Sequence, residues 1–410
     1  MEELGFLNTD IPIDVLSRLP TKILLGLKCV SKGWNCLISD RSFIKVQLKK
    51  TEPVVGFFFQ ERFQWCNDDI KSYSYIPIGT EGTEVWHTIF DFLPEDVTVL
   101  ASSNGLVCCR SCMPSPDPVI YVCNPSNKDW VSLKWDAHDK RNDLALAFDP
   151  FEDAIDISTN FKVDAHNKRI SLALAFDPFQ DPIDISTSFK VVRVRQMETD
   201  REDSYFSFEI YSSETGEWRK SKEICQYNRD LSKNNGIFIG GLLHWLTDGD
   251  QVLTFHVKNE LSWLLSEPFP TTEFKSIPET CIGESEGRLH YVMISEDGLQ
   301  VWVLEDYYES KWALKFSVTL EEMEEENPQL LYNICQRVGQ RVAIDMTAWM
   351  DPLAFKDGLL FMRVSIKIYL YHIETRKMEE LCTLSQLGTN SMFSPTVLPY
   401  TMSLVPLTRA

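Results

Sequence analysis

The stretch GESEG, residues 283–287, has the Gly-x-Ser-x-Gly spacing of a nucleophilic serine in a hydrolase. That arrangement needs a strand before the serine and a helix after it, so that the hydroxyl stands exposed on a sharp turn. The residues that follow, RLHYVMI, favour a strand, and Glu284 and Glu286 would oppose an anion developing beside Ser285. We therefore interpret the stretch as a turn between two strands.

The seven histidines and eleven cysteines do not show the spacing of a metal site. There is no HExxH pair, and Cys108, Cys109, Cys112 and Cys123 do not form paired CxxC motifs. Cys108 and Cys109 are adjacent in a strand-like run, where neighbouring side chains face opposite ways. We interpret these residues as buried thiols. Because a Gly-rich phosphate loop is also missing, we expect no cofactor, no metal and no catalytic residue, and a chain that is not itself an enzyme.

The composition restricts the partners. The 410 residues are 44% hydrophobic, which suits a globular chain, and the net charge of −20 would repel nucleic acid. No apolar run approaches the roughly 18 residues that span a bilayer, and the acidic N-terminus lacks the features of a signal peptide. With an odd number of cysteines, we expect reduced thiols and a location in the cytoplasm and/or nucleus, with neither nucleic acid nor membrane as partner.

The first fifty residues must form the helical part of the chain. Pro20 interrupts the first helical segment, Thr21 can cap the next helix, and Ser31 can cap a further one. This predicts a small domain of three helices, marginal alone and resting on a partner. Its apolar side chains recur every three or four residues, at Ile23, Leu27, Val30, Trp34, Leu37 and Ile38.

The stretch LSRLPTKILLGLKCVSKGWNCLISDRSFIKVQL resembles an F-box, especially its plant form. The resemblance places this domain at residues 7–50 and implies docking onto a Skp-type adaptor and, through it, a cullin. The chain departs from the family in having Asn8 after Leu7, and Pro12 in the first helix, which costs little only if the helix begins there. The adaptor-binding positions that the resemblance implies are Ile11, Val15, Leu16, Leu19, Pro20, Leu24, Val30, Ser31 and Trp34.

Residues 52–405 carry a different pattern, made of short strands that begin after glycine and end near tryptophan. The offset between Gly241 and Gly287 is the size of a four-stranded propeller blade or a Kelch-like repeat. We therefore predict an α+β fold by domain, with a small three-helix F-box followed by an all-β propeller-like domain. Tryptophans recur at matching positions of the repeats and are expected to be structural: Trp130, Trp218, Trp263 and Trp312.

The same region resembles the F-box-associated domain of plant F-box proteins, through NGLVCCR…YVCNPSNKDW, LAFDP…FKVVRV and IYSSETGEWRK. The resemblance implies the substrate-recognition subunit of an SCF-type cullin ubiquitin ligase, whose β-domain binds a target protein of unknown identity. The alternative is a β-propeller interaction scaffold with a degenerate F-box. The acidic run EEMEEEN, residues 321–327, is expected to be a solvated helix face or loop, although a contact with a basic partner stays open.

Residues 136–163 and 164–191 are a tandem duplication, with 22 of 28 positions identical. Because the repeat is shorter than a blade and occurs only twice, it is not the repeat that builds the fold. It is either a recent duplication or an error in the gene model. Each copy has the pattern of a strand, a turn and a strand, and the second runs directly into VVRVRQ. We expect the second copy to be the native one and residues 136–163 to form an extruded hairpin or loop.

Overall fold

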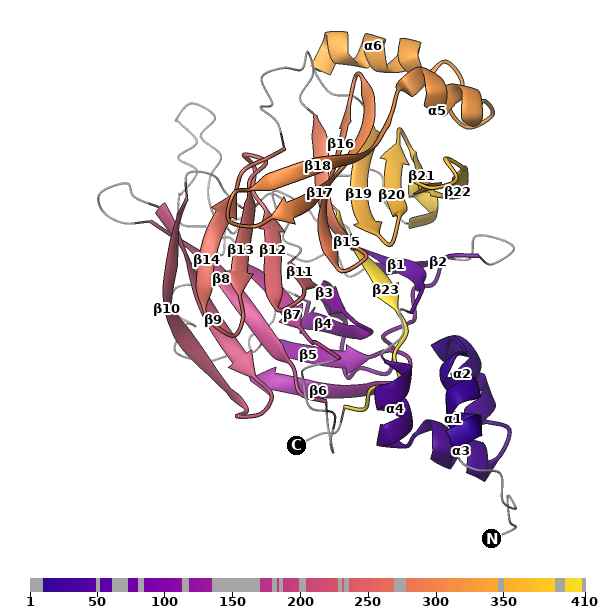
Figure 1. The fold of residues 1–410 in the computed structure, drawn as a ribbon, viewed down its shortest axis with the longest axis vertical. Coiled ribbons are helices and arrows are strands. Elements are labelled where there is room, and N and C mark those ends of the chain that lie inside the picture. Colours follow the sequence, from indigo (N-terminus) through magenta and orange to yellow (C-terminus); the bar gives the residue numbers. More distant parts are fainter. Residues whose placement is uncertain are drawn as a thin grey trace, which may run out of the picture.

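A group of short helices leads into a series of antiparallel sheets (Figure 1). The structure is a computed structural model. It describes residues 10–48, 52–60, 73–79, 85–112, 118–134, 170–178, 183, 187–198, 204–227, 231, 236–268, 278–345, 350–387 and 395–407.

Four helices are described in the N-terminal domain, not the three expected. The fourth arises because the Asp40 side chain accepts a hydrogen bond from the Ser42 amide at 2.8 Å and so begins another helix. Ser31 caps α3 as expected, accepting from the Trp34 amide at 3.2 Å. Pro12 lies in the first turn of α1, where its missing N–H costs little. The helices are α1 (Asp10–Ser17), α2 (Thr21–Lys28), α3 (Lys32–Ile38) and α4 (Arg41–Gln47).

The described strands form six sheet units arranged in a ring. One strand of each unit contacts a strand of the next, in the order β3, β7, β11, β15, β19, β23 and back to β3, so the ring closes as in a propeller. Five of the units are four-stranded antiparallel meanders. These contain β3 (Val97–Ser103), β4 (Leu106–Ser111), β5 (Val119–Asn124), β6 (Asp129–Lys134); β7 (Ile170–Ala175), β8 (Lys190–Glu198), β9 (Ser204–Ser212), β10 (Glu217–Tyr227); β11 (Ile237–Ile239), β12 (Leu242–Leu246), β13 (Val252–His256), β14 (Leu261–Leu265); β15 (Glu279–Ser285), β16 (Arg288–Ser295), β17 (Gly298–Asp306), β18 (Lys311–Val318); and β19 (Met350–Lys356), β20 (Leu359–Val364), β21 (Lys367–His372), β22 (Met378–Thr383).

Four of the meanders begin with the same tight turn, which explains the recurring glycine of the sequence. The two central residues of each turn both have positive φ, as a two-residue type I′ hairpin requires. In a chain of L-amino acids, the Cβ atom disfavours positive φ, so this conformation favours glycine at the second position. The four pairs are Asn104–Gly105, Gly240–Gly241, Glu286–Gly287 and Asp357–Gly358.

The sixth unit closes the ring with strands from both ends of the chain. In it, β1 (Val54–Gln60) pairs with β2 (Tyr73–Pro77) on one side and with β23 (Thr396–Thr401) on the other. Because the last strand is held between the first strand and its neighbours in the ring, the propeller is complete only when the C-terminal residues are in place.

Two of the meanders are joined into one eight-stranded sheet by a short parallel pairing of β15 with β19. Gly283 makes this close approach possible, since a Cβ there would lie 2.1 Å from the Phe355 carbonyl oxygen. A residue with any side chain at this position would push the two strands apart.

The second copy of the duplication supplies β7, whose alternate residues enter two different cores. Leu172, Leu174 and Phe176 pack on one side, and Ala173 and Ala175 on the other. The second strand of the strand, turn and strand pattern is described only in part in this copy. Ile183 and Thr187 form only an isolated bridge, and β8 begins at residue 190, where it pairs with the end of β7. The first copy, residues 136–163, lies outside the described residues.

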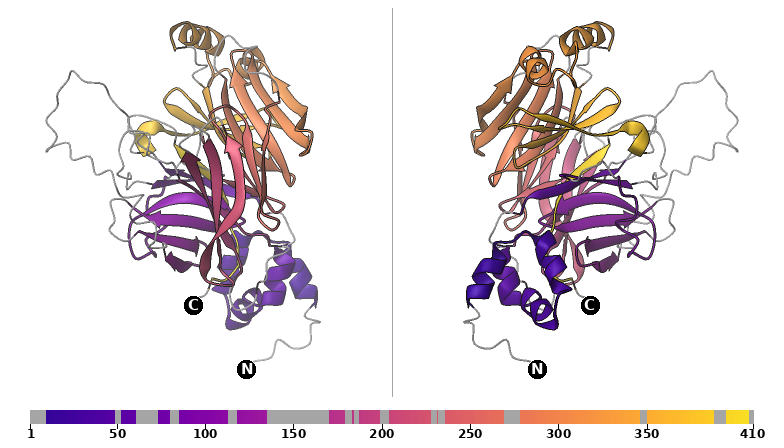
Figure 2. Two further views of the ribbon diagram at one scale, coloured as in Figure 1. Left: turned by 90° about the vertical axis from the view of Figure 1, so that its left-hand side faces the viewer. Right: turned by 90° about the vertical axis from the view of Figure 1, so that its right-hand side faces the viewer.

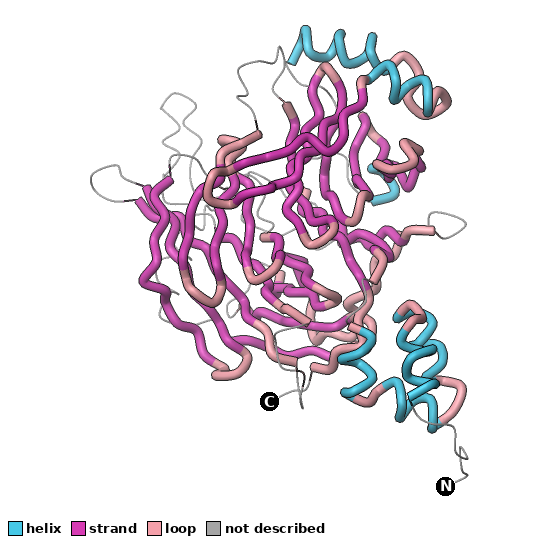
Figure 3. Tube along the Cα trace, in the orientation of Figure 1, coloured by secondary structure: helices cyan, strands magenta, loops and turns pink. Residues whose placement is uncertain are grey.

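Helices occupy the two ends of the molecule, with strands between them (Figure 3). The helices α1–α4 lie at one end, and α5 (Leu320–Glu326) and α6 (Ile334–Asp345) lie at the other (Figures 1 and 2). The acidic run forms α5, whose capping box joins Thr319 and Glu322, and its buried side is limited to Leu320 and Met323. This confirms a solvated helix face.

Candidate functional site

The helical domain and the propeller share one hydrophobic core. Buried side chains from the helices, such as Leu24, Phe43 and Ile44, belong to the same cluster as Leu133 and Leu174 of the propeller. Burial of this kind stabilises by about 25 cal/mol for each Å² of apolar surface removed from water. The helical domain therefore rests on its own propeller.

The last residues of the chain are part of this junction. Residues 403–407, here named the C-terminal strap, place Leu404, Val405 and Leu407 in the shared core. The buried Asn124 amide donates hydrogen bonds to the carbonyl oxygens of Ser403 and Val405, both at 2.9 Å. The strap thus ties the end of the chain to the first meander, beside the helical domain.

The start of α2 is capped from a distance and not by its own first residue. Thr21 was expected to be the cap, but Pro20 occupies that position and Thr21 is already helical. Its amide and hydroxyl donate to the Glu52 carboxylate, the hydroxyl at 2.9 Å, and the Gln47 amide approaches the same carboxylate. A carboxylate at a helix N-terminus satisfies the amides that have no partner within the helix. Burial raises the pKa of Glu52, which these hydrogen bonds oppose.

The nine positions that the resemblance implied for adaptor binding differ in exposure. Val15 is 56% exposed and Val30 66% exposed, and Pro20 and Ser31 are also exposed. Leu16 and Leu24 are buried.

Leu19 and Trp34 are partly buried against the shared core. Ile11 lies in α1, and its side chain is outside the described residues. The eight residues whose side chains are described therefore differ in position, with four on the surface, two buried and two partly buried.

Ile23 is a candidate contact residue in addition to the nine positions that the resemblance implied. It is 51% exposed in α2. The signal was present, because α2 has apolar residues at positions 23, 24, 25 and 27, too many for one buried face of a helix. Since Leu24 fills the core, its neighbour Ile23 must point elsewhere.

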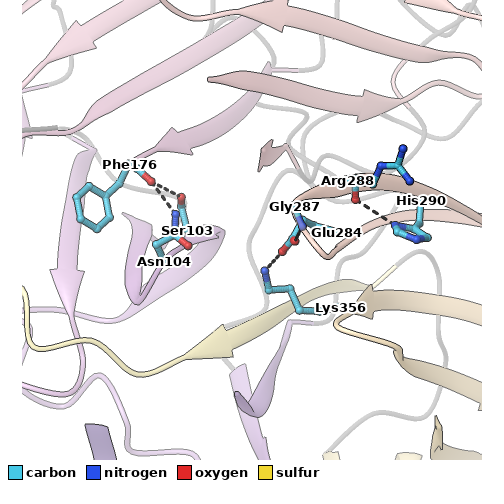
Figure 4. Close-up of polar contacts among 8 residues, drawn as sticks. All are labelled: Ser103, Asn104, Phe176, Glu284, Gly287, Arg288, His290 and Lys356. Atoms are coloured by element: carbon cyan, nitrogen blue, oxygen red, sulfur yellow. Dashed lines mark hydrogen bonds and ion pairs between the residues drawn. The ribbon is translucent and has the colours of Figure 1, made fainter. Parts of the chain in front are cut away.

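A cavity of about 90 Å³ lies where the first strands of several meanders meet. It is lined by Asn104, Glu284 and Lys356, among others. Small-molecule sites usually enclose 300–1,000 Å³, so this cavity suits water better than a ligand. Lys356 and Glu284 form an ion pair across it (Figure 4), and burial lowers the pKa of Lys356.

The GESEG stretch forms a hairpin turn and not a nucleophile elbow, as expected. Ser285 is buried at the end of β15 and pairs with Arg288 across the turn. Glu284 accepts a hydrogen bond from the Gly287 amide at 2.7 Å, and His290 contacts the Arg288 carbonyl at 3.0 Å (Figure 4). These polar groups therefore hold the hairpin itself.

Three of the four clustered cysteines, Cys108, Cys109 and Cys123, are buried as expected, whereas Cys112 is only partly buried. Cys108 and Cys109 lie on opposite sides of β4 in two different cores, and burial raises the pKa of each thiol. A thiol that stays protonated is a poor metal ligand. Among the described residues, no three His, Cys, Asp or Glu side chains gather as a metal site would need.

The four recurring tryptophans have a structural position. Each lies near the start of the fourth strand of its meander, in β6, β10, β14 and β18. Each packs beside a hydrophobic core, as expected: Trp130, Trp218, Trp263 and Trp312.

No helix in the described part of the chain is long and apolar enough to cross a membrane.

Comparison with known proteins agrees with the two parts of the fold. Residues 10–45 match the F-box domain, and residues 85–332, more than half of the chain, match the family described as F-box protein At3g26010-like, beta-propeller. F-box protein At5g49610 of Arabidopsis thaliana is 26% identical over 335 residues, covering 76% of this chain and 78% of that protein. F-box protein At5g07610 of the same plant is 26% identical over 344 residues, covering 78% and 72%.

Among solved structures, TolB from Acinetobacter baumannii aligns with a TM-score of 0.36 and 8% identity, over 90% of this chain and 73% of that one. At this score the likeness adds nothing to the sheets described above.

Proposed function

Because this chain belongs to the family of F-box proteins with an At3g26010-like β-propeller, we propose that it is the substrate-recognition subunit of an SCF-type cullin ubiquitin ligase. Its helical domain docks onto a Skp-type adaptor, and its propeller binds the protein to be ubiquitinated. The chain carries out no chemistry of its own. It acts by holding the target near the ligase, which raises the effective concentration of one for the other.

One observation supports adaptor docking above the others, namely the exposed apolar side chains of the helical domain. Of the ten large hydrophobic residues exposed in the described part of the chain, Val15, Ile23 and Val30 fall within sixteen consecutive positions. Six other apolar residues of the domain are buried in the core shared with the propeller, namely Leu16, Leu24, Ile38, Phe43, Ile44 and Leu48. Apolar side chains left on so small a domain are typical of a surface that a partner covers.

The positions that the resemblance implied for adaptor binding have different roles in this proposal. Val15, Ile23 and Val30 contact the adaptor directly, with Pro20 at the start of α2. Ser31 fixes the start of α3 by its cap. Leu16 and Leu24 pack inside the domain and hold the helices in place. Leu19 and Trp34, which are partly buried, serve both the core and the adaptor contact. Ile11 stays in the proposed contact set.

Co-purification with a Skp-type adaptor tests the docking face. The Ile23→Asp and Val30→Asp variants should each reduce adaptor recovery at least tenfold, because each buries a charge at an apolar contact. Leu261→Asp is the matched control, since Leu261 is 54% exposed on β14 and lies in the propeller. Recovery of no adaptor by the folded wild-type chain would overturn the proposal.

The runner-up is an interaction scaffold whose F-box no longer docks. The shared core supports this alternative, because part of the apolar surface of the helical domain is already buried against the propeller. The same co-purification separates the two functions. The proposal places the protein in the cytoplasm and/or nucleus, which imaging of a fluorescent fusion tests.

A further inference from the structure

The proposed adaptor contact depends on where α2 lies. Ile23 is exposed within this helix, and Val30 is exposed just after it. The Val30 amide donates a hydrogen bond to the Leu27 carbonyl at 3.0 Å, so Val30 is attached to the last turn of the helix. Any group that holds α2 in place therefore also sets the position of both contact residues.

The start of α2 is attached to the point where the ring closes. The Glu52 carboxylate accepts hydrogen bonds from Thr21, from its amide at 3.2 Å and from its hydroxyl at 2.9 Å. Glu52 lies two residues before Val54, the first residue of β1, and Val54 is paired with Thr401 of β23. The pairing that completes the propeller thus begins next to the residue that caps α2.

The end of α2 is attached to the first meander and to the C-terminal strap. Burial lowers the pKa of Lys28, in the last turn of α2, and the charge of Asp129 at the start of β6 opposes this shift. Asp129 also accepts a hydrogen bond from the Leu407 amide of the strap, at 3.5 Å. Between the two ends of the helix, Leu24 is buried in the same core as Leu404 of the strap.

These attachments depend on one pair of strands. Because Val54 pairs with Thr401, Glu52 before β1 and the strap after β23 leave the sixth unit at the same end, and the chain after β23 runs toward the helical domain (Figure 1). We name Glu52, Asp129 and the strap together the α2 clamp. The clamp is complete only when β23 is paired with β1.

The helical domain has little core of its own to replace the clamp. Its described helices span residues 10–47, and a domain of this size is marginal alone. The strap adds three apolar side chains to the core that buries the helices, and all three are almost fully buried: Leu404, Val405 and Leu407. Without the strap, the side of the helices that faces this core would lose part of its cover.

We propose that docking onto the adaptor is conditional on a closed propeller. Pairing of β23 with β1 brings the α2 clamp onto its helix, and α2 then presents Ile23 and Val30 in the arrangement that the adaptor binds. A chain whose ring is open stays out of the ligase, so that targets are recruited only by a complete propeller. The inference rests on the proposed function, because it concerns how the adaptor contact is formed.

The test compares two buried leucines in the full chain. Leu404→Ala opens a cavity in the strap, and Leu299→Ala opens one in β17, in a different core; both leucines are at most 1% exposed. Titration with a Skp-type adaptor, below the unfolding temperature of both variants, should give at least tenfold weaker binding for Leu404→Ala and wild-type binding for Leu299→Ala. A tenfold smaller docking-competent fraction weakens the apparent affinity tenfold.

Hydrogen exchange measures the clamp without the adaptor. The amides of α2 should exchange at least tenfold faster in Leu404→Ala than in the wild type, because the helix opens locally, and at the wild-type rate in Leu299→Ala. If Leu404→Ala does not fold, Leu407→Ala takes its place, since Leu407 is buried in the same core.

Two results would overturn the inference. The first is equal adaptor affinity for the strap variant and Leu299→Ala, because equal retention shows that the strap is not needed and equal loss shows that general stability decides docking. The second is unchanged exchange of α2 in the strap variant. Failure of the wild-type chain to bind the adaptor would refute the proposed function instead, and the exchange rates would still test the clamp.

Discussion

Replacing Asn124 by alanine should release the C-terminal strap. The Asn124 side chain is fully buried, and it holds the strap through the carbonyl oxygens of Ser403 and Val405. It also accepts a hydrogen bond from the Ser126 amide at 3.0 Å. Asn127 provides a matched comparison, because its amide donates to the strap at Leu404 and Val405 but its side chain is only partly buried.

The expected magnitude follows from what each change leaves without a partner. In Asn124→Ala the Ser403 carbonyl loses the donor that Asn124 supplies, which costs about 1–3 kcal/mol for a buried group, and the lost bond from Ser126 adds about 0.5–1.5 kcal/mol. Val405 keeps its bond from Asn127. The free energy of unfolding should therefore fall by about 2–4 kcal/mol. For Asn127→Ala it should fall by less than about 1 kcal/mol, because Val405 keeps its bond from Asn124 and removal of the partly exposed Asn127 side chain opens the Leu404 carbonyl to water.

Urea unfolding followed by tryptophan fluorescence measures both changes, with limited proteolysis as a local readout at the C-terminus. Asn124→Ala should unfold at lower urea and lose its C-terminal residues faster than Asn127→Ala. If the free energies of unfolding of the two variants differ by less than about 0.5 kcal/mol, burial of the asparagine does not decide how much its hydrogen bonds to the strap stabilise the protein, and the reasoning is refuted.

Three further predictions concern other parts of the chain. Gly283→Ala should destabilise the protein by more than about 2 kcal/mol in urea, through the clash with β19, whereas Gly339→Ala, which meets no atom within 4 Å, should be neutral or stabilising. Burial raises the pKa of Glu52, so the stability it contributes is complete below its ordinary value of 4.5 and is lost as the pH rises through the folded-state pKa. In the Glu52→Gln variant the midpoint of urea unfolding should therefore depend less on pH, between 4.5 and the folded-state pKa of Glu52, than in the wild type. The same pH dependence in both proteins would contradict this. Deleting residues 164–191 leaves the first copy to take the place of β7, with Asp143 at the buried position of Ser171, and should lower the melting temperature, whereas deleting residues 136–163 should leave it nearly unchanged. Unfolding by both deletions would show that the duplication has become structural.

The local elements could be predicted closely because their signals lie within a few residues. The GESEG stretch was expected to be a turn between two strands and is the β15–β16 turn. The glycines that open the repeats occupy the second central position of type I′ turns, where positive φ favours glycine. Ser31 caps α3 because a cap needs only an oxygen three residues before an amide.

The errors arose where a distant residue decided a local feature. Thr21 appeared to be its own cap, but the carboxylate of Glu52, thirty-one positions later, fills that role. Likewise, distant contacts decide that Leu24 is buried while Ile23 beside it is exposed. Spacing on one helix does not say which of two adjacent apolar residues meets the rest of the protein.

The sequence by itself therefore determined the two domains, the β-meanders and the family to which they belong, because hydrophobic period, turn residues and caps act over short distances. Only the tertiary structure decided how the ring closes with β23, and how the C-terminal strap and the helical domain share one core. Each of these depends on groups far apart in the sequence, whose contacts exist only after the whole chain has folded.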